Sequence, residues 1–311
     1  MIPTVSERPE LAVVGHVEWV TFAKVARVPR AGEIVHAEEP FEEPAGGGAV
    51  AAVQLARLAG TCTLVTALGE DEHGRKAVAR LEELGVEVKA AWRRTEPTRT
   101  AVTLLDGDGE RTIVTLGPRL EPTGADKELE WAELAKMDGV YFTAGDLEAL
   151  KEARAAKILV ASPRAIDALG KGVALDGLVL SEDDALERAE AAEAGAEAKT
   201  TGAEAKTTGA RAKTAGARAR TGLVVRTEGA KGGVYETGTG ETGRWRPAQV
   251  PGEAVDSYGC GDSFAAGLTY GLGAGMARRA ALELAARCGA VCLTGRGPYE
   301  AQLSAADIAD A

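Results

Sequence analysis

The sequence predicts an α/β protein in which helices flank a mainly parallel, doubly wound sheet. Short apolar segments of strand length alternate with longer segments whose apolar residues recur at helical spacing. The chain of 311 residues is long enough to bury one large α/β core and a small appendage. A glycine-rich turn also stands where an extended segment meets an alanine-rich helix, an arrangement that can bind an anion. We therefore expect a single domain over residues 1–311.

The elements expected in the first half follow this alternation. Residues 11–15 form a short apolar strand, and residues 50–59 form a helix with an apolar stripe. Residues 63–67 form the next strand, and residues 74–84 form a helix that ends at Gly85. Further short strands are predicted over residues 139–143, 157–161, 177–180, 223–227 and 233–236.

Two stretches, at about residues 16–44 and 92–118, break this rhythm. In the second stretch, segments over residues 101–105 and 111–116 flank the turn sequence Asp-Gly-Asp-Gly at residues 106–109. Such a turn between two β-prone segments predicts a hairpin. The hairpin is therefore expected outside the alternating strand–helix pattern.

The composition favours an intracellular enzyme rather than a protein of nucleic acid or membranes. A formal charge of −11 and a pI near 5.0 argue against a nucleic-acid surface and favour a solvated acidic face. The sequence shows neither a signal-peptide pattern nor an apolar run long enough to span a bilayer. We expect a soluble, cytoplasmic protein with four buried free thiols in a reducing compartment, at Cys62, Cys260, Cys288 and Cys292.

Residues 195–221 carry a heptad repeat whose units each begin with Gly-Ala. A coiled coil needs large apolar residues at two positions per heptad, and here those positions hold alanine. Each repeat also contains a glycine, which costs about 1 kcal/mol of helix propensity. We interpret the segment as a low-complexity, solvent-exposed insertion that extends the helix after Ser181. An ordered helix that binds a partner is the alternative, and neither interpretation has a catalytic role.

The segment from Asp256 to Asp262 carries the strongest chemical signal, with the pattern D-x-x-G-x-G-D ahead of a helix predicted to begin near Ser263. Glycine lets the backbone turn tightly, and a helix N-terminus adds unpaired donors and partial positive charge. The turn can therefore cradle an anion, with Asp262 beside it as a base for an attacking hydroxyl. A glycine-rich turn in which Asp262 serves only as the helix N-cap is the alternative.

This pattern resembles the C-terminal signature of the ribokinase-like, or PfkB, family of carbohydrate and nucleoside kinases. The resemblance spans nearly the whole chain except about residues 187–221, and it implies the ribokinase-like fold. In that family, strands such as those of the two irregular stretches form a small β-sheet lid over the sugar site, which can also form a homodimer. Other family motifs are matched in order at residues 29–35, 44–50, 69–74 and 227–233.

The implied reaction is transfer of the γ-phosphoryl group of ATP to a hydroxyl of a small acceptor. The resemblance makes Asp262 the expected base, and ordinary aspartate acidity is expected to suffice. The amides of Gly259, Cys260 and Gly261 are expected to hold the γ-phosphoryl oxygens as charge redistributes.

Mg²⁺ is expected to bind the phosphates of the nucleotide, and the protein is expected to hold the ion largely through water molecules. The family's N-x-x-E motif serves this ion indirectly, and Ser181 and Asp184 match its two polar positions. The alternative is that Ser181 caps a helix and Asp184 favours its first turn.

Three segments match the family's nucleotide site, at residues 227–233, at residues 288–297 and at the loop that begins with Asp256, which is the other loop on the cation side. The turn at residues 227–233 lines the adenine nucleotide in relatives, and a plain β-turn is the alternative there. Residues 288–297 resemble the segment that wraps the ribose and often supplies backbone oxygens to a monovalent cation, which leaves K⁺ dependence open. The implied cofactor-binding residues are Thr227, Gly229, Gly232, Asp256, Gly289 and Cys292.

The acceptor site is where the chain departs from the family pattern. Relatives commonly place Asp or Asn in the first strand-loop, where this chain has His16 and Glu18. Either side chain could meet acceptor hydroxyls, although a lone histidine is more often structural. Trp19 could stack on the face of a ring.

The glycine-rich signature contains Gly46, Gly47 and Gly48 and normally ends in Asn, but Val50 occupies that position here. We expect the three glycines and Glu18 to lie beneath the lid and face Asp262. Loss of a polar contact at Val50 argues against ribose itself as the acceptor.

Three functions remain open at this point. A sugar-type kinase is favoured, and a nucleoside kinase on the same fold is the alternative, which an aromatic-lined acceptor pocket would support. A ligand-binding or regulatory relative without turnover is disfavoured because the motif around Asp262 is intact.

Overall fold

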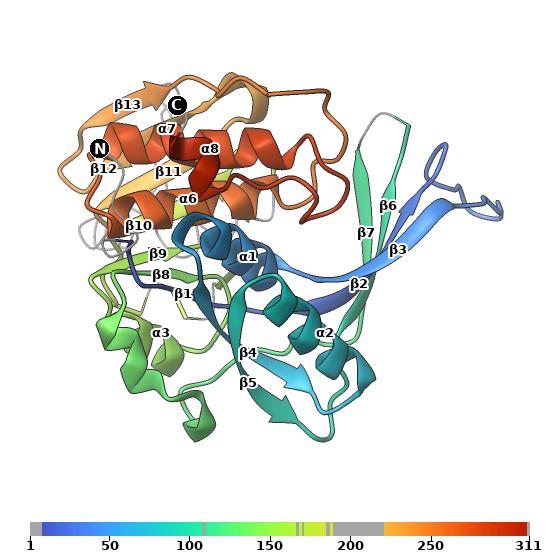
Figure 1. The fold of residues 1–311 in the computed structure, drawn as a ribbon, viewed down its shortest axis with the longest axis horizontal. Helices are drawn as coiled ribbons and strands as arrows, with labels where there is room; N and C mark the ends of the chain where they lie inside the picture. The colour runs from blue at the N-terminus through green and yellow to red at the C-terminus, as the bar shows by residue number, and fades with distance from the viewer. Residues whose placement is uncertain are drawn as a thin grey trace, which may run out of the picture.

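The computed structural model describes residues 8–107, 110–165, 168–169, 171–184, 187–188 and 221–309 (Figure 1). The repeat predicted over residues 195–221 lies outside these ranges except for Thr221, and so do residues 108–109 of the predicted hairpin turn. Within the described ranges, no helix combines the length and apolar character needed to cross a membrane.

A nine-stranded sheet runs through the body in the order β13-β12-β11-β10-β9-β8-β1-β4-β5. All neighbours from β5 to β11 pair in parallel, and β12 and β13 extend one edge in antiparallel pairing. The expected doubly wound, mainly parallel sheet is confirmed. Its strands are β1 (Leu11–Val14), β4 (Cys62–Gly69), β5 (Val86–Arg93), β8 (Gly139–Phe142), β9 (Ile158–Ala161), β10 (Gly177–Ser181), β11 (Leu223–Thr227), β12 (Gly233–Thr237) and β13 (Thr242–Trp245).

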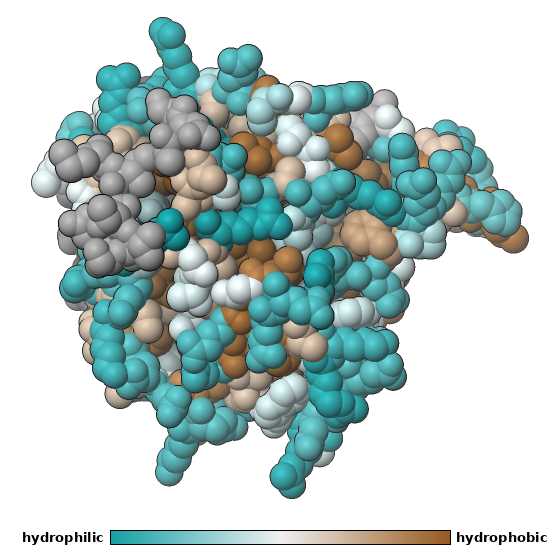
Figure 2. Space-filling view, viewed as in Figure 1, coloured by the Kyte–Doolittle hydropathy of each residue, from teal (hydrophilic) through white to brown (hydrophobic). Residues whose placement is uncertain are grey.

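Helices cover both faces of this sheet, and each face has its own core. They are α1 (Gly47–Ala59), α2 (Glu72–Glu83), α3 (Leu147–Ala153), α6 (Cys260–Gly273), α7 (Arg278–Cys292) and α8 (Ala305–Ala309), with 3₁₀ helices η2 (Lys127–Leu129), η3 (Trp131–Lys136), η4 (Pro163–Ala165) and η5 (Gly229–Lys231). Leu11 and Val13 of β1 belong to the core shared with α1, α6 and α7, whereas Ala12 and Val14 belong to the core shared with α3. Alternate strand residues point to opposite faces, which explains this division. The outer surface around α1 and α2 is mostly hydrophilic (Figure 2).

The two irregular stretches form a separate four-stranded sheet, the lid, in the order β3-β2-β6-β7. Its strands are β2 (Glu18–Lys24), β3 (Glu38–Ala45), β6 (Thr100–Leu105) and β7 (Arg111–Leu116). Strands β6 and β7 pair in antiparallel register, which confirms the predicted hairpin. Strand β2 joins this hairpin to β3 by parallel pairing with β6 and antiparallel pairing with β3. Figure 1 shows the lid projecting from one side of the body.

Two helices begin three residues earlier than the apolar pattern indicates. Helix α1 begins at Gly47, and α6 begins at Cys260 rather than near Ser263. The preceding residues, Gly46 and Gly259, have φ values of 90° and 82°. Glycine adopts this left-handed backbone without strain, so the chain can enter each helix at once. A first helical turn that contains glycines adds little to the apolar pattern, so the pattern places the start of each helix too late.

The sequence pattern also misses strands β5 and β13. Both lie at the edges of the large sheet. In β5 most residues are exposed or half-buried, with Glu87 and Lys89 among them, and β13 contains only four residues. Edge strands of this kind carry little of the continuous apolar signal that marks a central parallel strand.

Candidate active site

Residues 256–262, called the catalytic turn after the role expected from the sequence, run into the first turn of α6. The first amides of a helix lack intrahelical partners, and its N-terminus carries partial positive charge. A Cβ placed on Gly261 would meet no described heavy atom within 4 Å, so the turn faces open space there. Asp262 is the third residue of α6, and the N-cap is Gly259 without a side-chain cap bond. The alternative interpretation of Asp262 as the helix N-cap is therefore wrong.

Asp256 ties the catalytic turn to the C-terminal loop. Its Oδ1 atom accepts a hydrogen bond from the Tyr258 amide at 2.8 Å, and its Oδ2 atom accepts one from the Gly297 amide at 2.9 Å. The side chain is buried, and both oxygens are engaged. Asp256 thus holds together the two loops that the family resemblance assigns to a monovalent cation.

Val50 and Cys292 support the catalytic turn from behind. A Cβ on Gly259 would lie 2.8 Å from Val50 Cγ1, and Cys292 Sγ donates to the Tyr258 carbonyl at 3.3 Å. Both side chains are fully buried. Cys292, expected at the nucleotide, therefore packs behind the turn, and the valine in place of the family's Asn contributes packing.

A cavity of about 440 Å³ opens beside the catalytic turn. This volume falls within the range of small-molecule sites. The catalytic turn lines it through Gly259, Cys260, Gly261 and Asp262. Residues predicted for the nucleotide also line it, namely Thr227, Gly229, Gly232 and Gly289. The structure thus brings the predicted base, anion turn and nucleotide residues to one cavity.

Burial raises the pKa of Asp262 to about 6, against the ordinary acidity expected from the sequence. The positive charges of Arg164 and Arg111 oppose this rise, and the negative charges of Glu187 and Glu18 add to it. Arg111 reaches from the lid strand β7 and donates to the Ser257 carbonyl at 2.7 Å. Asp262 can therefore change protonation close to neutral pH, as a general base requires.

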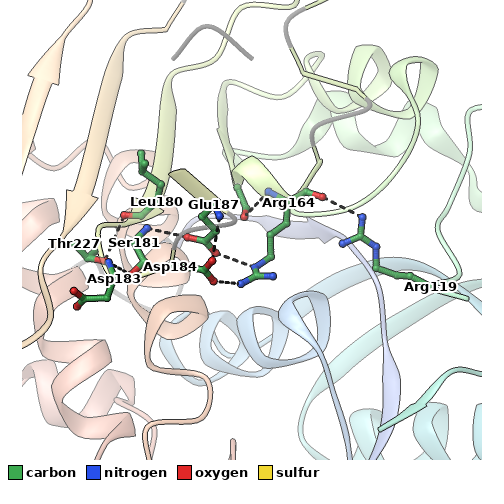
Figure 3. Close-up of polar contacts among 9 residues, drawn as sticks. Arg119, Arg164, Leu180, Ser181, Asp183, Asp184, Glu187 and Thr227 are labelled. Atoms are coloured by element: carbon green, nitrogen blue, oxygen red, sulfur yellow. Dashed lines mark hydrogen bonds and ion pairs between the residues drawn. The ribbon is translucent and has the colours of Figure 1, made fainter. Parts of the chain in front are cut away.

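Arg164 is the centre of an ion-pair network that the sequence does not reveal (Figure 3). Its Nη2 atom donates to Asp184 Oδ2, and its Nε atom donates to Glu187 Oε1 at 2.9 Å. Glu187 Oε2 in turn accepts the Ser181 amide at 2.8 Å. Arg164 follows β9, and Asp184 and Glu187 follow β10. The carboxyl ends of neighbouring parallel strands meet at one edge of a sheet. The place of these residues just after two such strands was therefore the feature of the sequence that could have indicated that they lie together.

The carboxylates of Asp183, Asp184 and Glu187 line the cavity. Asp184 Oδ1 accepts the Glu187 amide at 3.1 Å, a contact three residues along the chain that is typical of a helix cap. Its other oxygen binds Arg164, so Asp184 has structural work of its own. Among the described residues, no group of three acidic, histidine or cysteine side chains could hold a metal ion. These three carboxylates therefore fit Mg²⁺ only if the ion arrives bound to the nucleotide and they contact it through its water ligands.

The first strand-loop and the glycine turn meet at Asp262, on the side away from the cavity. The Gly48 amide donates to the His16 carbonyl at 3.2 Å, and the Gly46 amide donates to Tyr258 Oη at 3.3 Å. A Cβ on Gly47 would lie 2.9 Å from Asp262 Oδ1. The predicted juxtaposition of the glycine turn with Asp262 is present in the structure.

His16 and Glu18 are buried beside this turn, with exposed fractions of 8% and 6%. Burial lowers the pKa of His16 to about 3, so the imidazole is neutral, and burial raises the pKa of Glu18. His16 Nδ1 and Glu18 Oε2 have no hydrogen-bond partner among the described residues. Arg99 Nε lies 3.4 Å from Glu18 Oε2 as an ion pair.

Trp19 faces away from the acceptor side. It stacks on His73 of α2, with ring centroids 5.9 Å apart and planes inclined by 15°. Neighbouring residues of a strand point to opposite faces, so Glu18 and Trp19 cannot both face the same ligand. The expectation that Trp19 provides a stacking surface for the acceptor is therefore wrong.

Comparison with protein families gives a match over residues 8–305 to the model described as "pfkB family carbohydrate kinase". A ribokinase of Dictyostelium discoideum is 29% identical over 108 residues, which cover 34% of this chain and 34% of that relative. The chain thus aligns with about a third of that curated relative. An "ATP-dependent ribose-1-phosphate kinase" of Halopiger xanaduensis is 28% identical over 281 residues, which cover 89% of each chain.

Comparison with solved structures confirms the ribokinase-like fold. The structure of Arabidopsis thaliana ribokinase, described as complexed with ribose and ATP, matches with a TM-score of 0.73. The match covers 97% of this chain and 98% of that chain at 20% identity, which speaks for the fold alone.

Proposed function

The chain belongs to the pfkB family of carbohydrate kinases, and we propose that it transfers the γ-phosphoryl group of ATP to a hydroxyl of a small sugar-type acceptor. One observation carries this proposal: Asp262 lies in the first turn of α6, between a nucleotide-sized cavity and the glycine turn at Gly47. A base and an anion-binding helix terminus thus share one short segment. The ATP named with the Arabidopsis ribokinase structure supports the choice of nucleotide.

In the proposed reaction the protein positions the reactants and stabilises the transferring charge. The nucleotide would occupy the cavity, and the amides of Gly259 and Gly261 would face the γ-phosphoryl oxygens. The Cys260 amide donates a hydrogen bond to the Ser257 carbonyl at 3.4 Å, so it would be a weaker donor to the γ-phosphoryl oxygens. Asp262 would accept the hydroxyl proton late in a loose transition state.

Magnesium bound to the nucleotide would neutralise phosphate charge, and Asp184 and Glu187 are the residues that would meet its water shell. The proposal also includes a K⁺ ion bound at the two loops that the Asp256 side chain joins. All four cysteines are free, although Cys260 is half-buried at the cavity rather than buried as expected, and the free thiols support the proposed cytoplasmic location.

The acceptor side favours a sugar over a nucleoside. A nucleoside site would gain from an aromatic platform, and Trp19, the candidate in the first strand-loop, stacks on His73 instead. The lid supports a further proposal, a homodimer. Val114 and Leu116 are more than half exposed on the edge strand β7, and pairing of two lids would cover them.

The test is an ATP-consumption screen over sugars and nucleosides with the parent chain and Asp262→Asn. We expect turnover on at least one acceptor and a loss of about 10²-fold or more in the variant, because the proton then has no positioned acceptor. Nucleotide affinity should change little, which direct titration with ATP measures. Equal turnover by parent and variant would remove Asp262 from the mechanism.

A further inference from the structure

Helices α6 and α7 lie side by side and pack closely together (Figure 1). A Cβ on Gly271 would lie 2.8 Å from the Cα atom of Ala281. One turn nearer the start of α6, a Cβ on Gly267 would lie 2.9 Å from the Cα atom of Ala285, one turn nearer the end of α7. The two helices are therefore antiparallel, and each turn toward the start of α6 faces a turn toward the end of α7.

This register continues to Cys260 and Cys292, which are the first residue of α6 and the last residue of α7. A Cβ on Gly289 would lie 3.2 Å from the carbonyl oxygen of Cys260, so the last turn of α7 lies beside the first residue of α6. The Sγ atom of Cys292 lies 3.7 Å from the position of a Cβ on Gly259, the neighbour of Cys260. The two cysteines therefore face each other across the helix pair.

The thiols of this pair also interact with each other. Contact with Cys292 raises the pKa of Cys260, and the same contact lowers the pKa of Cys292. Helices that pack this closely bring facing residues toward the Cα separation of about 4.4–6.8 Å that a disulfide needs. The other two cysteines lie elsewhere, since Cys288 Sγ is 2.7 Å from the Cβ position of Gly267 and Cys62 begins strand β4.

The two thiols differ in their access to the active site. Cys260 is half-buried and lines the cavity, whereas Cys292 is fully buried behind the catalytic turn. A small oxidant that enters the cavity therefore meets Cys260 first and finds a second thiol directly behind it. Redox-sensing cysteines are often arranged in this way, with an accessible thiol next to a resolving one.

We propose that Cys260 and Cys292 form a reversible disulfide that switches the enzyme off under oxidising conditions. Hydrogen peroxide would oxidise the Cys260 thiol to a sulfenic acid and be reduced to water. Cys292 would then lose its proton and attack that sulfur, so that an S–S bond forms and a second water leaves. A dithiol would reverse the change by thiol–disulfide exchange. The loss of turnover rests on the proposed kinase function, whereas the disulfide itself does not.

The disulfide would act on the turn that is proposed to hold the γ-phosphoryl group. Cys292 Sγ donates to the Tyr258 carbonyl at 3.3 Å, and oxidation of the sulfur removes this donor. The Cys260 side chain would also turn from the cavity toward α7 and move its own amide. Since the amides of Gly259 and Gly261 flank that amide, the anion-binding turn would shift. A displacement of about 1 Å can cost about 100-fold in rate.

The first test measures the disulfide directly and needs no turnover. The reduced protein is treated with hydrogen peroxide and unfolded, and its free thiols and intact mass are then measured. We expect two of the four thiols to disappear, the mass to fall by two hydrogen atoms, and a peptide map to join Cys260 to Cys292. Four remaining thiols, a bond to Cys62 or Cys288, or oxidised Cys260 without a crosslink would overturn the proposal.

The second test follows the rate of each protein after peroxide relative to its own rate before treatment. Cys292→Ala is compared with the parent, and Cys62→Ala is the matched control because it removes a fully buried thiol from the start of β4. The parent and Cys62→Ala should lose about 100-fold in kcat/KM and recover with dithiothreitol. Cys292→Ala should keep most of its rate. Cys292→Ser, which keeps a donor for the Tyr258 carbonyl, takes its place if the alanine variant is unstable.

Two outcomes would overturn the switch and leave the kinase function standing. One is full activity of the crosslinked parent. The other is an equal and equally reversible loss in Cys292→Ala or Cys292→Ser, which cannot form the bond. Saturating ATP should slow crosslinking of the parent, because the nucleotide would cover Cys260 in the cavity. An unchanged rate of crosslinking would count against the proposed place of the nucleotide instead.

Discussion

Gly47 and Asp262 face each other so closely that a Cβ on Gly47 would lie 2.9 Å from Asp262 Oδ1 and 3.0 Å from Thr143 Oγ1. Gly47 is the first residue of α1, and Asp262 lies in the first turn of α6. Two helix N-termini far apart in sequence therefore meet at the proposed reaction centre. The absence of a side chain at residue 47 leaves room for the carboxylate.

Gly47→Ala should reduce turnover strongly with little change in melting temperature. The new methyl group would press on the ends of two side chains, Asp262 and Thr143, which can move, and the backbone at Gly47 has no left-handed φ. A displaced base costs about 10²-fold in rate. Gly252→Ala is the control, because its Cβ would meet only ordinary contacts of 3.7 Å or more. Full activity of Gly47→Ala would show that the carboxylate does not act from this position.

The raised pKa of Asp262 predicts an acidic limb in the pH profile of kcat/KM. The base must be ionised, so activity should be half-maximal near pH 6 and fall about tenfold per pH unit below it. Arg164→Gln should move the limb to higher pH, because Arg164 is the main charge that lowers the pKa and its loss also frees the Glu187 charge. Arg279→Gln, on the exposed start of α7, should leave the limb in place. A limb that stays put in Arg164→Gln would contradict this electrostatic assignment.

Glu18→Ala should raise KM for the acceptor more than KM for ATP. Glu18 Oε2 is buried and makes no hydrogen bond within the described residues, and its contact is the 3.4 Å ion pair with Arg99, while the nucleotide residues lie on the other side of Asp262. Initial-rate measurements with each substrate varied in turn separate the two constants. Glu42→Ala is the control on the same lid, since its carboxylate makes only an exposed contact with Thr21. A selective rise in KM for ATP would indicate that Glu18 acts on the nucleotide, and would contradict its assignment to the acceptor site.

Deletion of residues 195–214 should leave melting temperature and catalysis nearly unchanged. This prediction comes from sequence, since the segment lies outside the described residues. The repeats offer alanine and glycine in place of a large apolar stripe and so have little to bury. Thermal unfolding, rate measurements and gel filtration of both proteins provide the test. A change in oligomeric state or a large loss of solubility would indicate that the repeats pack against another surface.

Local patterns in the chain were enough to predict the parallel sheet, the lid hairpin and the turn around Asp262. Strand alternation, helical spacing and the turn chemistry of glycine depend on residues close together in sequence, so they can be read without a structure. The same reasoning failed at the edge strand β5 and at the glycine-rich starts of α1 and α6, where local signals are weak.

The tertiary structure alone decided which distant side chains share the site. The pairing of Arg164 with Glu187, and the approach of Arg99 to Glu18, follow from the order of strands in the two sheets. The pKa of Asp262 depends on burial and on charges from four separate segments. Even Glu18 and Trp19, adjacent in sequence, have opposite surroundings because the sheet has two faces. Such long-range placement is a property of the packed chain, and no short window of sequence contains it.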